Sequence, residues 1–158
     1  MPPHVCSHAH SVVRLPLLRD ATGLNAHLQA ALPMNRFRPN IVVGGARPFE
    51  EDEWASLAVG AQTTFASVKP CSRCKVTTID QATGVDGMEP LRTLSSFRSG
   101  AALGWVNKEP GGASWRAQAF FGWNLVFAQP PAPGAVLSVG DAVRVLARRD
   151  WAAVTPDA

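Results

Sequence analysis

Proline and glycine, scattered along the whole chain, constrain its fold more than any other feature. There are 13 prolines and 13 glycines among 158 residues. Proline ends or kinks a helix and glycine weakens one, so long uninterrupted helices are not expected and a pure helical bundle is disfavoured. A chain of this length is expected to form one domain and to bury roughly 70% of its unfolded surface, which is enough for a hydrophobic core.

Charge and cysteine content exclude several classes of protein. With 46% hydrophobic and 17% charged residues, the chain does not have the composition of a disordered protein. The net charge of +3 is too small for the dense basic face of a nucleic-acid-binding protein, so no nucleic-acid partner is expected. Three cysteines, Cys6, Cys71 and Cys74, are too few for a secreted disulfide framework. They favour an intracellular, reducing location, without distinguishing mitochondrial from cytoplasmic.

No membrane span and no secretory signal are predicted. The longest uncharged segment, residues 117–140, is interrupted by three prolines at 130–133 and by polar side chains. A spanning helix needs about 20 mostly apolar residues without such a break. Residues 1–11 lack the apolar stretch of a secretory signal.

Hydrophobic patterns predict many short strands and two or three short helices. Helical segments are expected at residues 20–32, 48–54 and 89–98, and strands at 41–43, 58–69, 75–80, 103–106, 117–128 and 135–146. Pro70 is expected to break the second strand. The pattern indicates a strand-rich α+β domain with a barrel or a strongly curved sheet. The five tryptophans are expected in the core or at its edge, and the acidic run at residues 50–53 is interpreted as a solvated face.

The one compact chemical feature is the pair Cys71-x-x-Cys74. It is compatible with half of a zinc site, a redox dithiol, a pair with one thiolate ligand for a soft metal, or two ordinary packed residues. A zinc site would need further ligands from the N-terminal segment, whose candidates are His4, Cys6, His8 and His10. The redox interpretation is disfavoured because the β-branched residues 76–79 do not suit the helix that such a pair precedes.

Neighbouring cations favour the soft-metal interpretation. Arg73 and Lys75 flank Cys74, and cations favour the thiolate form that binds metal. Arg36, Arg38 and Asn40 could offer guanidinium and amide donors to an anionic cofactor. On spacing alone, however, solvated surface arginines are the better interpretation.

Seven short sequence motifs, which occur in a fixed order along the chain, are more specific than the patterns of a generic domain. They are residues 35–43 (NRFRPNIVV), 49–54 (FEEDEW), 68–74 (VKPCSRC), 77–84 (TTIDQATG), 89–98 (EPLRTL--FR), 121–124 (FGWN) and 139–143 (VGDAV). Together they resemble the MOSC domain, the C-terminal domain of molybdenum cofactor sulfurases, and most closely its mitochondrial amidoxime-reducing branch. The resemblance predicts an irregular segment at 1–19, the MOSC domain at 20–148 and a C-terminal tail at 149–158. It corresponds to the C-terminal half of full-length members, which begin with a β-rich domain.

The resemblance implies a barrel-like fold and a molybdenum–molybdopterin cofactor. It assigns Cys74 as the catalytic metal ligand, with Cys71 as a packed thiol. It further implies cofactor contacts from Arg38, Asn40, Ser72, Arg73 and Asn124. A family-level association with pyridoxal phosphate binding is also implied.

The activity implied by the resemblance is reduction of small N-hydroxylated compounds such as amidoximes. Electrons would come from an NADH-dependent flavin reductase through a cytochrome b5-type haem protein. Because only one half of the family's length is matched, activity is expected once the N-terminal half is supplied. The alternatives are a truncated, non-catalytic module that binds or hands over the cofactor, and a small zinc-binding module. Loss of a packing partner also predicts self-association through exposed apolar surface.

Overall fold

A single six-stranded sheet organises the protein. The computed structural model describes residues 15–19, 21–106 and 112–150. The strands are β1 (Leu15–Arg19), β2 (Ile41–Val43), β3 (Trp54–Val59), β4 (Thr63–Ser72), β5 (Phe120–Phe127) and β6 (Val143–Arg148). The α-helices are α1 (Thr22–Asn25) and α2 (Leu91–Phe97), and the 3₁₀ helices are η1 (Met34–Phe37), η2 (Glu50–Glu53), η3 (Lys75–Thr78) and η4 (Gly112–Trp115). The predicted strand-rich α+β class is confirmed.

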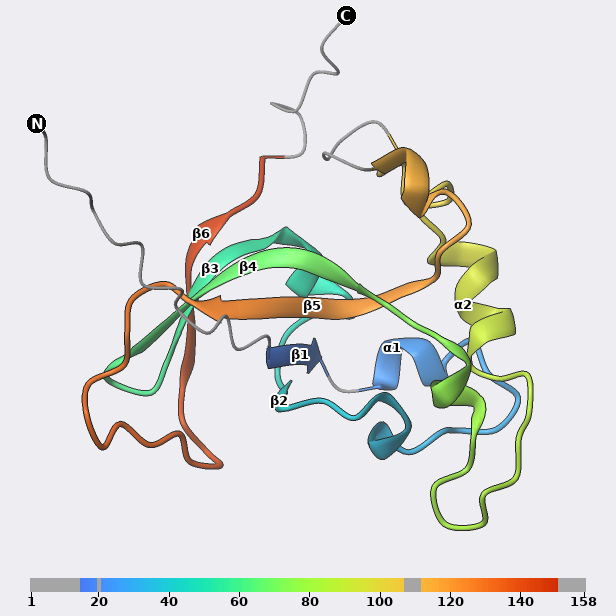
Figure 1. Ribbon diagram of the computed structural model, residues 1–158, viewed down its shortest axis with the longest axis horizontal. Helices are drawn as coiled ribbons and strands as arrows, with labels where there is room; N and C mark the ends of the chain where they lie inside the picture. The colour runs from blue at the N-terminus through green and yellow to red at the C-terminus, as the bar shows by residue number, and fades with distance from the viewer. Residues whose placement is uncertain (1–14, 20, 107–111, 151–158) are drawn as a thin grey trace, which may run out of the picture.

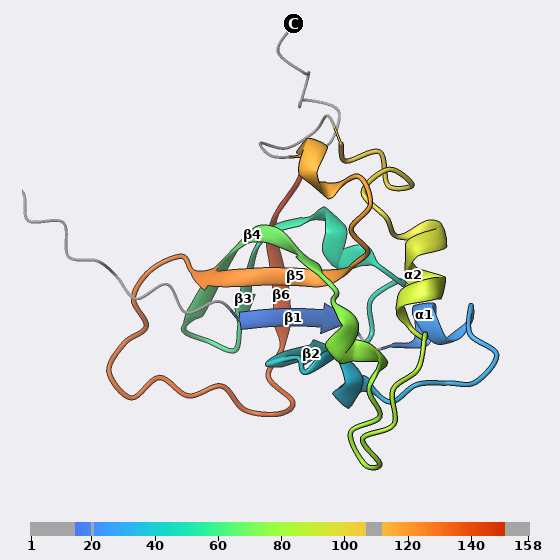
Figure 2. The same ribbon diagram turned by 45° about the vertical axis from the view of Figure 1, so that its right-hand side comes forward.

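The strand order in the sheet is β2-β1-β5-β4-β3-β6. Neighbours pair antiparallel except β1 and β2, which are parallel. The long strands β4 and β5 form the middle of the strongly twisted sheet, and both α-helices lie at one end of it (Figure 1). Turned by 45°, the view shows β5, β1 and β2 one below another, with β6 crossing behind them (Figure 2).

The sheet is open within the part of the chain that the structure describes, so the predicted closed barrel is not confirmed. Its edge strands are β2 and β6. Cavities of about 560 and 410 Å³ are lined by residues of β2 together with residues 137–145, which lead into and begin β6. The two edges therefore face one another across a gap, and the strongly curved alternative describes the sheet better.

Three groups of buried side chains form the core. One lies among β2, β3, β4 and β5 and includes Leu57 and Phe65. A second joins the helical end to β5 through Leu24 and Leu94, and a third gathers tryptophans around Phe120. Trp54, Trp105, Trp115 and Trp123 are all buried, as predicted; Trp151 lies outside the described residues.

The secondary structure predicted for the N-terminal part of the chain was wrong in part. Residues 15–19, expected in an irregular segment or at the start of a helix, form β1 between β2 and β5. The helix expected at 20–32 is reduced to the four residues of α1. The reason is tertiary, because pairing of Leu17 with both Ile41 and Trp123 overrides the local helical pattern.

Four strand predictions also need correction. The strand expected at 58–69 is a β3–β4 hairpin that turns at Gly60, where φ is +62°. Pro70 does not break β4, since it lies between two register shifts, where proline is tolerated. Residues 75–78 form η3 instead of a strand, and residues 103–106 and 135–142 hold no strand.

None of the described helices is long and apolar enough to span a membrane.

Candidate functional site

Cys74 lies where the chain leaves the sheet. After β4 ends at Ser72, the N–H of Arg73 donates to the carbonyl of Ala119 (2.8 Å), and Cys74 becomes the N-cap of η3. The carbonyl of Cys74 accepts two hydrogen bonds from Thr77, from its N–H (3.1 Å) and its hydroxyl (2.9 Å). Cys74 is a free, exposed cysteine. Its backbone is thus fixed while its sulfur faces solvent.

Cys71 has a different environment from Cys74. It lies in β4 and is half-buried, and this burial raises the pKa of its thiol. A raised pKa keeps the group a neutral thiol, in agreement with the interpretation of Cys71 as a packed residue. Cys71 and Cys74 are both free in the structure. The segment after Cys74 is the four-residue 3₁₀ turn η3 and not the helix that a redox pair precedes, so the structure gives the redox interpretation no support.

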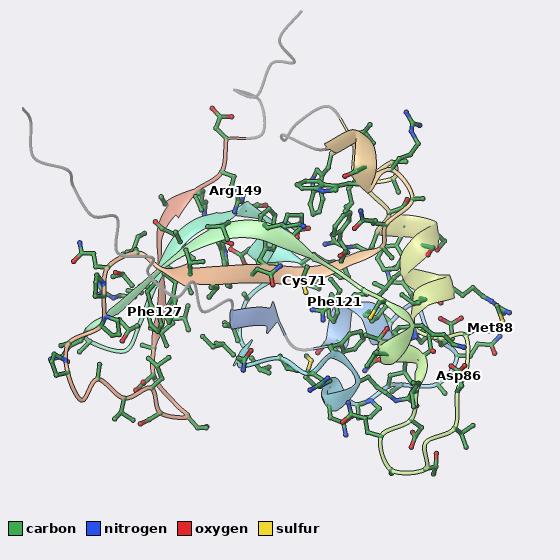
Figure 3. All side chains as sticks on the ribbon, in the orientation of Figure 1. Cys71, Asp86, Met88, Phe121, Phe127 and Arg149 are labelled. Carbon is green, nitrogen blue, oxygen red and sulfur yellow. The ribbon has the colours of Figure 1, made fainter. Side chains whose placement is uncertain are left out.

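The guanidinium of Arg73 is engaged by backbone carbonyls. Its Nε and Nη2 donate to the carbonyl of Phe121 (2.8 and 2.5 Å), and its Nη1 donates to the carbonyl of Phe37 (3.0 Å). It also lies 5.6 Å from the centre of the Phe37 ring. Burial lowers the pKa of Arg73, although a guanidinium remains charged at neutral pH. In Figure 3, Phe121 is labelled next to Cys71, where β5 and β4 run side by side.

Arg38 and Asn40 follow η1 and are both exposed. Arg38 is the C-cap of η1 and has a φ of +49°, a left-handed conformation that turns the chain toward β2. The hydrogen bond from Arg73 to the carbonyl of Phe37 joins the peptide before Arg38 to the residue before Cys74. Arg38 and Cys74 therefore lie on neighbouring segments, although they are 36 residues apart in the sequence (74 − 38 = 36).

Arg36 is not the solvated surface arginine that spacing suggested. Its side chain is 10% exposed, and it donates to the carbonyl of Thr78 (3.0 Å) and to Asp80 (2.8 Å). It therefore attaches η1 to the end of η3 and does not face a cofactor.

Asn124 lies in β5 between β1 and β4, opposite Pro16 and Lys69. Its Nδ2 donates to the carbonyls of Lys69 (3.2 Å) and Pro70 (3.4 Å). Ser72 is exposed at the end of β4, opposite Phe120. Both residues thus belong to the β4–β5 pair that leads to Cys74.

The structure brings Arg38, Ser72, Arg73 and Cys74 to one rim, formed by the ends of η1 and β4 and the start of η3. Asn40, two residues beyond Arg38, lines the cavity between β2 and residues 137–143, and Asn124 lies farther along the β4–β5 pair. Cys74, Arg38, Asn40 and Ser72 are exposed, whereas the Arg73 guanidinium and the Asn124 amide are directed at the protein's own carbonyls. An exposed cysteine sulfur and a nearby guanidinium are the donor types that suit a soft metal and a phosphate. The residues present therefore fit a cofactor that combines a metal with a phosphate.

A zinc centre finds no support in the described ranges, where no group of three or more His, Cys, Asp or Glu side chains could hold a metal ion. His4, Cys6, His8 and His10, the other ligands considered for zinc, lie outside those ranges.

Sequence reasoning missed the groups that build this rim. The carbonyls of Phe37 and Phe121 leave no signal in a sequence, because every residue carries one. The pair Thr77-Thr78 did offer a signal. The Thr78 hydroxyl donates to the carbonyl of Lys75 (2.7 Å), and such local bonds from threonine compete with a strand.

Comparison with known proteins gives the rim a context. The family model described as MOSC domain matches residues 15–144. Mitochondrial amidoxime reducing component 2 of Rattus norvegicus is 44% identical over 94 residues, 59% of this chain and 26% of that protein. The human component 1 is 43% identical over 76 residues, which cover 48% of this chain and 22% of the relative.

Other relatives are named for the molybdenum cofactor and not for amidoxime reduction. The molybdenum cofactor sulfurase of Danio rerio is 43% identical over 67 residues, 42% of this chain and 8% of that protein. The matched part thus spans about a quarter or less of the relatives' own length. The family match itself extends over most of this chain and includes Arg38, Asn40, Ser72, Arg73, Cys74 and Asn124. The chain belongs to the MOSC domain family.

Proposed function

We propose that this chain is a molybdenum-cofactor-binding oxidoreductase domain that takes part in the reduction of small N-hydroxylated compounds such as amidoximes. The observation that carries the proposal is an exposed Cys74 on a fixed turn, on the same rim as the exposed Arg38. Relatives named for amidoxime reduction and for the molybdenum cofactor support it.

Each exposed site residue has a distinct part in this proposal. The Cys74 sulfur would hold molybdenum, because a thiolate is a good ligand for a soft metal. The Arg38 guanidinium would bind the phosphate through paired N–H groups, and Asn40 and Ser72 would orient the pterin through hydrogen bonds. When bound, the cofactor would supply the oxygen and electron transfer that no side chain of this chain provides.

Partners and location belong to the same proposal. A cytochrome b5-type haem protein and an NADH-dependent flavin reductase would deliver the electrons, and an intracellular, mitochondrial setting would match the names of the relatives. Pyridoxal phosphate binding stays a prediction, as does self-association.

Elemental analysis of matched cysteine variants tests the proposal. The chain, Cys74→Ser and Cys71→Ser are expressed in a host that makes molybdopterin, and bound molybdenum and zinc are measured after purification. We expect near-stoichiometric molybdenum in the wild type and Cys71→Ser, and its loss in Cys74→Ser. Molybdenum retained by Cys74→Ser would overturn the assignment of the ligand, and zinc instead of molybdenum would move the function to a Cys/His site.

A second candidate is a module that carries or hands over the cofactor without turnover. It is favoured by the sulfurase relative and by the small share of each relative that the chain matches. Turnover of benzamidoxime by the purified, molybdenum-loaded chain with a cytochrome b5 system would exclude this candidate. Molybdenum binding without turnover would favour it.

A further inference from the structure

The strongest unexplained feature of the rim is the guanidinium of Arg73. Family resemblance places Arg73 against the cofactor, but its side chain bonds to two backbone carbonyls from two other segments. Phe37 belongs to η1 and Phe121 to β5, which lie 36 and 48 residues away in the sequence. A guanidinium has five N–H donors in a planar fork, and in Arg73 all three nitrogen atoms, Nε, Nη1 and Nη2, donate to these carbonyls.

We propose that Arg73 is a positioning residue, which sets Arg38 relative to Cys74, and that it does not bind the cofactor itself. This inference rests on the proposed function of the rim. Arg73 precedes Cys74, and the carbonyl to which Nη1 donates belongs to the peptide bond between Phe37 and Arg38. One side chain therefore links the metal-ligand segment to the phosphate-binding segment.

The linkage holds the end of η1, where the buried Phe37 ring also packs against Phe121. The start of η1 is tied to η3 and the following loop, since Arg36 donates to Thr78 and Asp80 and Gln81 donates to the carbonyl of Asn35. The Arg38 backbone beyond it adopts a left-handed φ, which is costly for a residue other than glycine and persists only where its surroundings hold it. The Arg73 bond to the Phe37 carbonyl lies directly beside this residue.

Lysine cannot replace this function. A lysine at position 73 would keep the positive charge, but a single ammonium on a flexible stem cannot span the carbonyls of Phe37 and Phe121 in one plane. Arg73→Lys is therefore expected to fold and to release η1 from the Cys74 segment.

Hydrogen–deuterium exchange on the cofactor-free full chain tests the linkage. We expect peptides that cover residues 34–40 to exchange faster in Arg73→Lys and in a second variant, Arg73→Gln, than in the wild type. Arg92→Lys, which alters an exposed arginine on α2, serves as the matched control and should leave these peptides unchanged. Unchanged exchange of residues 34–40 in both Arg73 variants would overturn the proposal.

A double-mutant cycle separates positioning from direct binding. Molybdenum cofactor released from a carrier protein is the probe, and its dissociation constant is measured for Arg73→Lys, Arg38→Met and the double variant. If Arg73 acts through Arg38, each single change weakens binding about tenfold, and the double variant binds no more weakly than Arg38→Met alone. Additive losses would overturn the proposal, because they indicate a separate contact with the cofactor or a general loss of stability.

The exchange experiment and the double-mutant cycle together distinguish a failure of this inference from a failure of the proposed function. If the wild type binds no molybdenum cofactor, the proposed function fails, while exchange in the cofactor-free chain still decides whether Arg73 links η1 to the Cys74 segment. If the wild type binds the cofactor and the cycle is additive, the function stands and the positioning role fails.

Discussion

The 3₁₀ turn η2 and the rim around the turns η1 and η3 differ in how their charged side chains are placed. The acidic turn η2 directs its side chains at partners from distant segments. Asp52 accepts two hydrogen bonds from Arg98 (2.6 and 3.0 Å) and one from the Trp123 indole (2.9 Å). Glu50 and Glu53 both pair with Arg148 of β6. The predicted solvated face is thus wrong, since the acids of η2 hold β5 and β6 to the turn before β3.

The rim around η1 and η3 leaves its reactive groups toward solvent. Cys74, Arg38 and Asn40 are exposed, and the buried arginines beside them, Arg36 and Arg73, hold the backbone in place. The difference teaches that a charged side chain with several fixed protein partners supports the structure. Candidates for chemistry are the exposed groups on a backbone that such partners have fixed.

The largest expected effect is the loss of the Asp52–Arg98 pair. Arg98 is buried and Asp52 is largely shielded from solvent, with 4% and 14% of their side-chain surface exposed. Asp52→Asn would leave the Arg98 charge in the interior without its counter-ion, and breaking a buried pair costs about 3–5 kcal/mol. We expect a loss of this size in the free energy of unfolding, measured by urea denaturation.

Glu53→Gln is the matched control for Asp52→Asn. Its pair with Arg148 is exposed at both ends (42% and 48%), and such pairs contribute about 0–1 kcal/mol. If the two variants lost equal free energies of unfolding, the side chain of Asp52 would have no greater structural role than an exposed acid, and η2 would be an ordinary charged surface.

A smaller effect is expected from Asn124, a predicted site residue with a structural contact. Asn124→Ala removes the amide that donates to the carbonyls of Lys69 and Pro70, and the net value of such a bond is about 1 kcal/mol. Lys69→Ala keeps the carbonyl that accepts this bond, so it should leave the stability within about 0.5 kcal/mol of the wild type. If Asn124→Ala lost molybdenum but no stability, its amide would serve the cofactor and not the β4–β5 pair.

Patterns of residue type predicted the fold class and the position of the site, but not the contacts that shape them. The strands β2 and β5, the α2 helix and the buried tryptophans follow from local runs of apolar side chains, and sequence alone places them. β1 was missed because its stability comes from pairing with β2 and β5, which are encoded elsewhere in the chain. The 3₁₀ turn η3 was missed because β-branched residues suggest a strand unless their hydroxyl groups bond locally, as Thr77 and Thr78 do.

The same limit applies to the site. The motif Cys-x-x-Cys and its flanking cations indicated Cys74, and resemblance indicated the other positions, of which the fold brings Arg38 close to the Cys74 segment. Which polar groups point outward could not be predicted, since Arg36, Arg38 and Arg73 look alike in a sequence. Arg36 and Arg73 differ from Arg38 by their fixed acceptors, which are Asp80 and the backbone carbonyls of Thr78, Phe37 and Phe121.

The smallest expected effect concerns the exposed pair of Lys75 and Asp86, next to Cys74. Lys75 Nζ lies 2.6 Å from Asp86, and this hydrogen bond, with a second from the Thr78 hydroxyl, lowers the pKa of the Asp86 carboxyl. A lowered pKa in the folded state means that the interaction stabilises the fold above the ordinary carboxyl pKa and is lost as pH falls through the lowered value.

Lys75→Met should therefore move the titration midpoint of Asp86 upward, toward the ordinary value, as followed by NMR of its carboxyl carbon. Thr78→Val should move it in the same direction by less, because the Lys75 bond is the larger of the two causes. The unfolding free energy at neutral pH should change far less than in Asp52→Asn, since both members of this pair are largely exposed (76% and 44%). An unmoved midpoint in Lys75→Met would show that the ion pair between Lys75 and Asp86 does not persist in solution, so Lys75 would not contribute to holding η3.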